Sequence, residues 1–140
     1  MIEIREMRIE DYEEVYLLWQ RSDGIEVCTR GSDSMENIAR YLERNPGCSY
    51  VAFDGGILVG IALAGHDGKR GLIHHTAVEV KYRGQGIGRE LVERCMEGIR
   101  AAGIPKCYIL VVRADNESRG FWERTGWDLR TELVLMSKYT

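Results

Sequence analysis

Residues Tyr82–Leu91, with the sequence YRGQGIGREL, place a glycine at every second position from Gly84 to Gly88. Glycine adopts backbone angles that are closed to other residues. The first turn of a helix exposes unpaired N–H groups, and its dipole attracts an anion. On these residues alone, two interpretations stay open: a tight turn, or a loop that lets a phosphate approach the backbone.

The elements on either side of the glycines predict a β-α-β crossover. Leu72–Val80, LIHHTAVEV, is rich in β-branched residues and predicts a strand. An amphipathic pattern then begins near Gly86 and ends at Gly103, as expected of a helix. Cys107–Val112, CYILVV, is a continuous apolar run, typical of a strand that is buried on both faces.

The residues before the crossover predict a strand, two helices and a hairpin. The first segment, IEIREM, alternates between apolar and polar residues as a half-buried strand does. Asp11 is the expected N-cap of the first helix, with Glu14 completing a capping box, and Ser34 is the expected N-cap of the second. Gly55 and Gly56 mark a tight turn between two strands.

The residues after the crossover predict a short helix and a last strand. The helix carries FWERTGW and should stop at Gly126. TELVLMSKY, residues 131–139, reads as the last strand, with a further short strand expected at Trp127–Arg130. The predicted order is βααβββαβαβ, an α/β fold (α+β, mixed sheet) whose central mixed sheet is flanked by helices.

Length and composition exclude several classes of protein. The chain has 140 residues, which predicts a single domain over 1–140. No apolar run approaches the roughly 20 residues of a membrane span, and the first residues contain no apolar segment typical of a secretory signal. We therefore expect a cytoplasmic protein with no membrane partner. The net charge of −3 argues against nucleic acid. The four cysteines form no CxxC pair, so no metal is expected.

Two common phosphate-binding motifs do not match the glycine stretch. A P-loop requires Lys and Ser or Thr directly after its last glycine, whereas Arg89 and Glu90 follow Gly88 here. A dinucleotide-binding loop has the spacing G-x-G-x-x-G and an acidic residue at the end of the next strand. The spacing here is G-x-G-x-G, and Cys107–Val112 lacks that acid.

A third motif does match. RGQGIG fits R/Q-x-x-G-x-G/A, with Arg83, Gly86 and Gly88 at the fixed positions. The segment from TAVEV to RADN resembles the core of the GNAT superfamily of N-acetyltransferases, in which this loop binds the pyrophosphate of acyl-CoA. FWERTGW is similar to the F-Y-x-x-x-G-F segment of that family, and the order of elements agrees over nearly the whole chain.

This resemblance implies the GNAT acyl-CoA N-acyltransferase fold, with acetyl-CoA as co-substrate between two parallel strands at Leu72–Val80 and Lys106–Arg113. It implies that Val78 N–H stabilises the oxyanion of the reaction. The residues that the resemblance assigns to acetyl-CoA are Ala77, Val78, Val80, Arg83, Gly84, Gln85, Gly86, Ile87, Gly88, Arg89 and Asn116.

The family's reaction is direct attack of an amine on the acetyl group. An amine like that of Lys, with a pKa of about 10.4, arrives protonated and must lose a proton. His74 is the expected base, because one family member has a strand histidine at the same distance from the loop, and Glu79 is the second candidate. Adjacent strand residues point to opposite faces, so we expect only one of His74 and His75 to serve.

The chain departs from the family at the tyrosine that acts as acid on the leaving thiolate. Trp122 occupies that position, and an indole N–H is no usable acid. Core packing with Phe121 is the preferred interpretation of Trp122, and Tyr108 and Tyr139 are the remaining candidate acids. The segment after Asn116 is also one residue shorter than is common, so that Asp115 would take the asparagine position at the usual spacing.

The acceptor is an amine whose identity the sequence leaves open: a small molecule, a protein N-terminus or a lysine. In the family the loop between the first two helices shapes the acceptor pocket, and here it carries Asp23, Glu26 and Asp33, which would suit a cationic amine. Small members often pair, so a homodimer is expected too. Two alternatives remain: a catalytically inactive CoA-binding regulatory module, and an unrelated protein that binds another phosphate ligand.

Overall fold

The computed structural model describes residues 1–140 except 24, 29–30 and 112–115. The chain forms two compact units, Met1–Leu110 and Val111–Thr140. In the parts described, no helix is both long and apolar enough to cross a bilayer.

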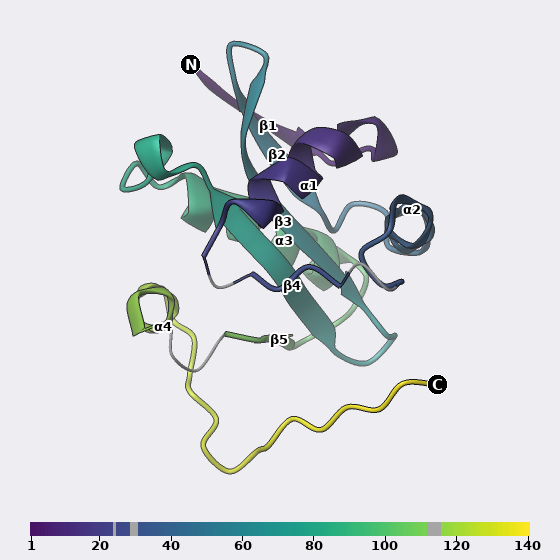
Figure 1. The fold of residues 1–140 in the computed structure, drawn as a ribbon. Coiled ribbons are helices and arrows are strands. Elements are labelled where there is room, and N and C mark those ends of the chain that lie inside the picture. The colour runs from purple at the N-terminus through teal and green to yellow at the C-terminus, as the bar shows by residue number, and fades with distance from the viewer. Residues whose placement is uncertain (24, 29–30, 112–115) are drawn as a thin grey trace. The chain divides into compact units, whose positions relative to one another are not determined.

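The first unit is built on a five-stranded sheet with the order β1-β2-β3-β4-β5 (Figure 1). The strands are β1 (Ile2–Glu6), β2 (Tyr50–Asp54), β3 (Ile57–His66), β4 (Gly71–Val78) and β5 (Cys107–Ile109). The pairs β1–β2, β2–β3 and β3–β4 are antiparallel, whereas β4 and β5 run parallel. Helix α3 (Ile87–Ala101) makes the crossover between them. The predicted mixed sheet and its crossover are confirmed.

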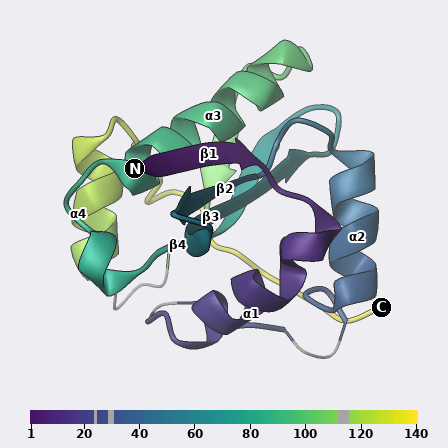
Figure 2. The same cartoon turned by 90° about the horizontal axis from the view of Figure 1, so that it is seen from above.

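Helices cover both faces of this sheet (Figure 2). On one face, α1 (Tyr12–Gln20) and α2 (Met35–Arg44) share a buried apolar cluster with side chains of β3 and β4. On the other face, α3 contacts β2, β3 and β4. The site residues of β4 therefore lie between two helical layers.

Local sequence signals located most of the turns and helix ends. Ser34 Oγ accepts a hydrogen bond from the Asn37 N–H at 3.2 Å, which confirms the expected N-cap of α2. Gly55 and Gly56 have φ of +57° and +86° in the hairpin between β2 and β3. Both angles fall in the left-handed region, as a tight hairpin turn requires.

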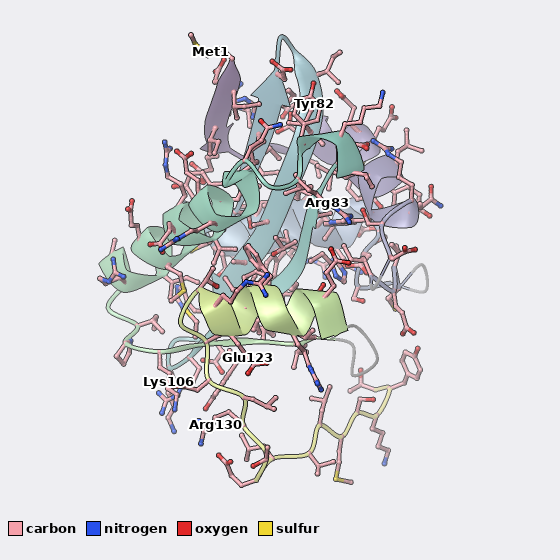
Figure 3. All side chains as sticks on the ribbon, turned by 90° about the vertical axis from the view of Figure 1, so that its left-hand side faces the viewer. Met1, Tyr82, Arg83, Lys106, Glu123 and Arg130 are labelled. Atoms are coloured by element: carbon pink, nitrogen blue, oxygen red, sulfur yellow. The ribbon has the colours of Figure 1, made fainter. Side chains whose placement is uncertain are left out.

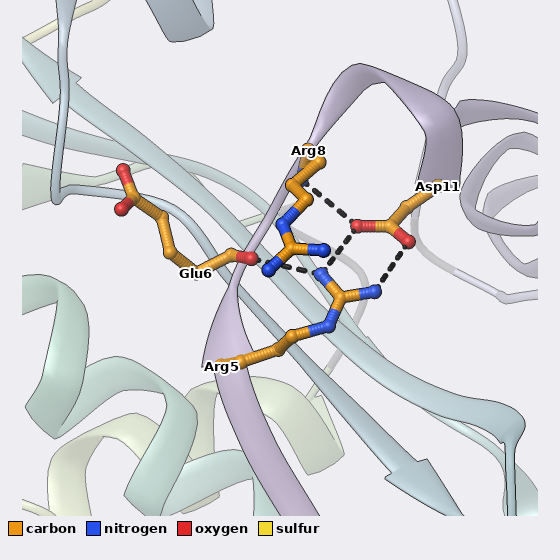
Figure 4. A network of polar contacts seen from close by, with 4 residues as sticks. All are labelled: Arg5, Glu6, Arg8 and Asp11. Carbon is orange, nitrogen blue, oxygen red and sulfur yellow. Dashed lines mark hydrogen bonds and ion pairs between the residues drawn. The ribbon is translucent and has the colours of Figure 1, made fainter.

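Asp11 does not cap α1 with its side chain, so the predicted capping box is wrong. Its carboxylate accepts from two guanidinium nitrogens of Arg5, at 2.8 and 2.9 Å, and from the Arg8 N–H at 2.8 Å (Figure 4). These contacts tie β1 to the 3-10 turn Ile9–Asp11, which precedes α1. A bidentate Arg–carboxylate pair is stronger than a cap to a neutral N–H, and this explains why the side chain turns toward Arg5.

Replacing Asp11 by asparagine should lower stability more at neutral pH than in acid. Burial alone would raise the pKa of Asp11, but the hydrogen bonds from Arg5 and Arg8 outweigh burial and lower it. The ionised carboxylate therefore stabilises the fold above its unfolded pKa of about 3.9, and this contribution is lost as the pH falls through the lower folded value. We expect D11N to lose roughly 1–3 kcal/mol of unfolding free energy at pH 7 and much less at pH 3.

Urea unfolding of both proteins at the two pH values measures this difference. Glu10→Gln is the matched control, because Glu10 is the exposed neighbour and accepts none of these bonds. A loss for D11N that is the same at pH 3 and pH 7 would show that the charge of Asp11 contributes nothing.

The second unit contains α4 (Asn116–Arg124) followed by residues 125–140. Gly126, with φ of +101°, follows the end of the helix as predicted. The predicted strands at Trp127–Arg130 and 131–139 are wrong, because no described residue after α4 pairs in a ladder. An alternating pattern becomes a strand only when a neighbouring strand accepts its hydrogen bonds. Strand β5 is also shorter than predicted and half-buried, and residues 112–115 lie outside the described structure.

Candidate functional site

The glycine stretch forms a turn between β4 and α3. Strand β4 ends at Val78, and a single 3-10 turn, Val80–Tyr82, begins two residues later. The Tyr82 hydroxyl donates to Asp54 Oδ2 at 2.6 Å, and Arg83 Nε donates to the Val78 carbonyl at 3.1 Å (Figure 3 labels Tyr82 and Arg83). These two contacts hold the turn against the ends of β2 and β4.

The conformation of this turn explains two of the three glycines. Gly84 and Gly86 have φ of +80° and +84°, and Gly86 is the N-cap of α3. A β-carbon at either position would meet no heavy atom within 4 Å, so the turn is also open to an approaching ligand. No side chain caps the helix at Gly86, so the first N–H groups of α3 keep no partner within the helix. The turn therefore needs its glycines for its backbone conformation, and it leaves helix N–H groups facing open space, as a site for an anion would require.

The residues expected to bind acetyl-CoA occupy three places in the structure. Most of them lie in or beside this turn: Val80, Arg83, Gly84, Gln85, Gly86, Ile87, Gly88 and Arg89. Ala77 and Val78 lie at the end of β4. Asn116 begins α4 in the second unit, and its side chain and Asp115 lie outside what the structure describes.

The end of β4 presents an open backbone edge. Among the described residues, β5 pairs with β4 only over Gly71–Ile73. On the other side, the Glu79 N–H donates to the Val59 carbonyl of β3 at 2.9 Å. Backbone groups of an antiparallel strand alternate in direction, so Ala77 faces β3 as Glu79 does, whereas Val78 directs its N–H and C=O away from β3, and its C=O accepts from Arg83 Nε. Val78 is thus the better placed of the two to bond a ligand there.

A β-bulge interrupts the pairing of β3 with β4. Ala62 pairs with Thr76, and Ala64 pairs with Ile73. Between these pairs, a single residue of β3 opposes two residues of β4, which are the two adjacent histidines. A bulge re-aims side chains locally, and here it cancels the usual alternation of faces.

Both histidines consequently face the layer of α1 and α2. The His74 ring lies edge-on against Tyr41 of α2, with 5.5 Å between ring centroids. The His75 ring lies against Trp19 of α1 at 4.9 Å. The two imidazoles are 6.4 Å apart. The expectation that they point to opposite faces is wrong, because it assumed a regular strand.

His75 is held by a carboxylate from the loop between α1 and α2. Its Nε2 lies 3.1 Å from Asp33 Oδ2, which also accepts the Cys28 N–H at 2.7 Å. Burial alone would raise the pKa of Asp33, but these two hydrogen bonds outweigh burial and lower it. An ionised Asp33 requires a proton on His75 Nε2, so this side of the imidazole is occupied.

His74 has a different environment, next to a cavity. Burial lowers the pKa of His74, and the neighbouring His75 lowers it further. An imidazole with a lowered pKa is neutral at pH 7 and can accept a proton. Glu79, the second candidate base, is ion-paired with Arg21 at the end of α1.

The cavity has a volume of about 310 Å³ and lies between α2 and the strands β3, β4 and β5. Tyr41, Leu72 and Tyr108 supply the aromatic and apolar part of its lining. His66 at the end of β3, Asp67 and Arg70 of the turn between β3 and β4, and His74 line the cavity as well. The segment HDGKRG, residues 66–71, was not among the sites expected from the sequence. A histidine, an acid and an arginine in a short turn were the available signal.

Trp122 packs against Phe121, as the sequence predicted. The Trp122 ring packs edge-on against Phe121 and Trp127, at 4.9 and 5.8 Å between centroids. Cys48 and Cys95 are buried thiols. In the described residues, no three His, Cys, Asp or Glu side chains come together as metal ligands would.

Comparison with protein families and sequences gives one consistent result. Residues 3–127 match the model of the acetyltransferase (GNAT) family. An acetyltransferase of Photorhabdus laumondii is 37% identical over 139 residues, which is 98% of this chain and 94% of the relative. An acetyltransferase of Sodalis glossinidius is 34% identical over 138 residues, again 98% of this chain and 94% of the relative.

Solved structures are similar in fold. The PaiA N-acetyltransferase of Thermoplasma acidophilum, solved in complex with coenzyme A, has a TM-score of 0.80 at 20% identity, covering 93% of this chain and 91% of that one. The aminoglycoside N-acetyltransferase AAC(6')-Iy, solved with a bisubstrate analogue, has a TM-score of 0.78 at 14% identity, covering 100% and 99%. At these identities the likeness concerns the fold.

Proposed function

Because this chain belongs to the GNAT family and is an acetyl-CoA-dependent N-acetyltransferase, we propose that the turn before α3 and the open edge of β4 hold its co-substrate and that His74 takes the proton of the amine. The observation that carries the proposal is the N-terminus of α3. It has a left-handed Gly86 as N-cap, no side-chain cap, and open space where a β-carbon would stand.

The residues present fit acetyl-CoA. The N–H groups from Gly84 to Arg89 and the positive end of the α3 dipole would hold the pyrophosphate. The Val78 C=O, which can accept a second hydrogen bond beside that from Arg83 Nε, would bond the pantetheine arm as an added strand does, with Ala77 and Val80 on either side. Asn116 stays a prediction from the family resemblance.

The reaction needs an amine that has lost its proton. The amine nitrogen forms a bond to the acetyl carbon, the carbon–sulfur bond breaks, and coenzyme A leaves as a thiolate. His74 can receive the proton of the amine because its lowered pKa keeps the imidazole neutral. Val78 N–H is the proposed donor to the oxygen that gains charge. Glu79 remains the second candidate, although its carboxylate is paired with Arg21.

Two finer proposals accompany this function. Buried thiols at Cys48 and Cys95 suit the reducing cytoplasm, where we place the protein. The homodimer stays a prediction from the family resemblance.

Calorimetric titration with acetyl-CoA tests the proposed site, with ATP and NAD as control ligands. We expect binding that is confined to acetyl-CoA and coenzyme A. Binding without turnover of any amine would support the inactive regulatory module instead. Binding of ATP or NAD without binding of coenzyme A would overturn the assignment of the turn to acetyl-CoA.

His74→Ala should lower kcat and remove the acid limb of the pH–rate profile. A base must be deprotonated to act, so the rate rises with pH through its pKa. The lowered pKa of His74 places this rise below the ordinary value of about 6.5. Removal of a general base typically costs about 10²–10⁴-fold. The measurement is kcat between pH 5 and 9 for both proteins.

His75→Ala is the matched control, because it removes the adjacent imidazole of the same bulge. H75A should keep the acid limb of the profile, since the Nε2 of His75 is occupied by Asp33 in the unmodified protein. If the limb disappears in H75A and persists in H74A, the base is His75 and the proposed role of His74 is wrong.

A further inference from the structure

We propose that the cavity beneath the β3–β4 turn is the acceptor subsite and that it selects small primary amines that carry a carboxylate. This inference rests on the proposed acetyl transfer and names the substrate class of that same site.

The cavity adjoins His74, the proposed base. His74 lines it, and His74 sits in the bulge directly after Ile73, the last residue of β4 that pairs with β5. A molecule in the cavity therefore contacts the proposed base at the point where the two parallel strands cease to pair. The amine end of an acceptor belongs at this end of the cavity.

The turn offers hydrogen-bond donors for an anion. His66 Nδ1 accepts the Gly68 N–H at 3.0 Å, so the neutral ring carries its proton on Nε2 and donates from there. Arg70 adds a guanidinium, which binds carboxylates well. Together they provide two side-chain donors that suit a carboxylate group.

The one acid of the turn is already engaged. Asp67 Oδ1 accepts the N–H groups of Lys69 and Arg70, both at 2.8 Å, and these bonds lower the pKa of Asp67. The Asp67 carboxylate thus shapes the turn through backbone contacts. No ion pair joins the Asp67 carboxylate to the Arg70 guanidinium, whose Nη1 donates to the Lys69 carbonyl at 3.1 Å and whose other N–H groups can face a ligand.

The size and lining of the cavity favour a small molecule over a protein. Its volume of about 310 Å³ lies at the lower end of small-molecule sites. Tyr41 and Tyr108 can contact the carbon skeleton of a ligand. The earlier expectation of a cationic acceptor included Asp33, but Asp33 is engaged by His75 and the Cys28 N–H.

The test compares amino acids with the amines that lack only their carboxylate. Release of coenzyme A from acetyl-CoA is measured with glycine and methylamine, β-alanine and ethylamine, 4-aminobutyrate and propylamine, leucine and 3-methylbutylamine, and phenylalanine and phenethylamine. A short peptide with a free N-terminus is included. We expect at least one pair to be acetylated with a kcat/KM about tenfold or more higher for the carboxylate member.

Arg70→Gln should abolish that preference through KM. The turn itself should stay intact, because Asp67 holds it by backbone N–H groups. Lys69→Gln is the matched control: it removes a neighbouring cation of the same turn that does not line the cavity, and it should keep the preference. Melting temperature and acetyl-CoA affinity should be unchanged in both variants.

The outcomes separate this inference from the function on which it rests. Equal use of both pair members, preference for the amine without carboxylate or for the peptide, or a preference that survives in R70Q would overturn the subsite. So would binding of acetyl-CoA with no acetylation of any compound in the panel. Failure to bind acetyl-CoA would instead overturn the proposed function.

Discussion

Gly86→Glu is expected to abolish acetyl-CoA binding while the protein stays folded. Gly86 is the N-cap of α3, and a β-carbon there would meet nothing within 4 Å. The new side chain therefore has room, and a carboxylate at a helix N-terminus favours the helix dipole. It would, however, bring negative charge to the N–H groups that we propose for the pyrophosphate. We expect affinity to fall by roughly 100-fold or more, as loss of charge-assisted bonds at a phosphate site implies.

Calorimetry with acetyl-CoA and a thermal melt measure the two halves of this prediction. The left-handed φ of +84° at Gly86 adds strain for any side chain. Gly103→Glu is the matched control, because Gly103 has φ of +87°, also faces open space, and follows the opposite end of α3. G103E should lose similar stability and keep its affinity. Unchanged acetyl-CoA affinity in G86E would refute the site. An equal loss of affinity in both variants would show that backbone strain, and not charge at the pyrophosphate site, causes the loss.

Gly98→Ala is expected to destabilise the protein severely, although alanine is the better helix former. Gly98 lies within α3, where alanine would ordinarily stabilise an exposed helix by about 1 kcal/mol. Its β-carbon would overlap the Gly47 carbonyl oxygen and lie 2.8 Å from the Gly47 carbonyl carbon. These are backbone atoms of the turn before β2 and cannot rotate away, so helix or turn must move.

The overlap should cost about 2–4 kcal/mol of unfolding free energy, which is at the upper end for overpacking. For a chain of this length this lowers the melting temperature by roughly 10 °C. Glu97→Ala serves as the control, because it places the same residue at the exposed neighbouring position of α3. E97A should melt close to the unmodified protein. A melting temperature for G98A that equals or exceeds that of E97A would mean that α3 does not pack so closely on this turn.

The turn between β4 and α3 could be predicted because its causes are local. Gly84 and Gly86 take left-handed angles in the structure, as their spacing indicated, and Gly86 begins the helix. The Ser34 cap, the hairpin at Gly55 and Gly56, and the end of α3 before Gly103 depend likewise on a few neighbouring residues. Nearest-neighbour sterics and hydrogen bonds suffice for such features.

Prediction from the chain failed where groups outside a segment decide its structure. Asp11 had a sound local role as a cap, but the Arg5 guanidinium on β1 takes its carboxylate. Residues 131–139 alternate as a strand does, yet they form no ladder among the described residues. In both cases the structure of the segment depends on groups outside it, and the pattern of residues within the segment does not identify those groups.

One part of the candidate site is likewise determined by local sequence, and the other part depends on how two strands pair. The conformation of the turn proposed for the pyrophosphate is encoded in RGQGIG, since backbone conformation and helix dipole arise within a few residues. The pairing register of β3 with β4 created the bulge that turns His74 and His75 to one face. That face brings His75 to Asp33 and His74 to the cavity with Tyr41 and Arg70. Register is a property of two strands together, so only the folded structure could place the residues of the proposed acceptor subsite.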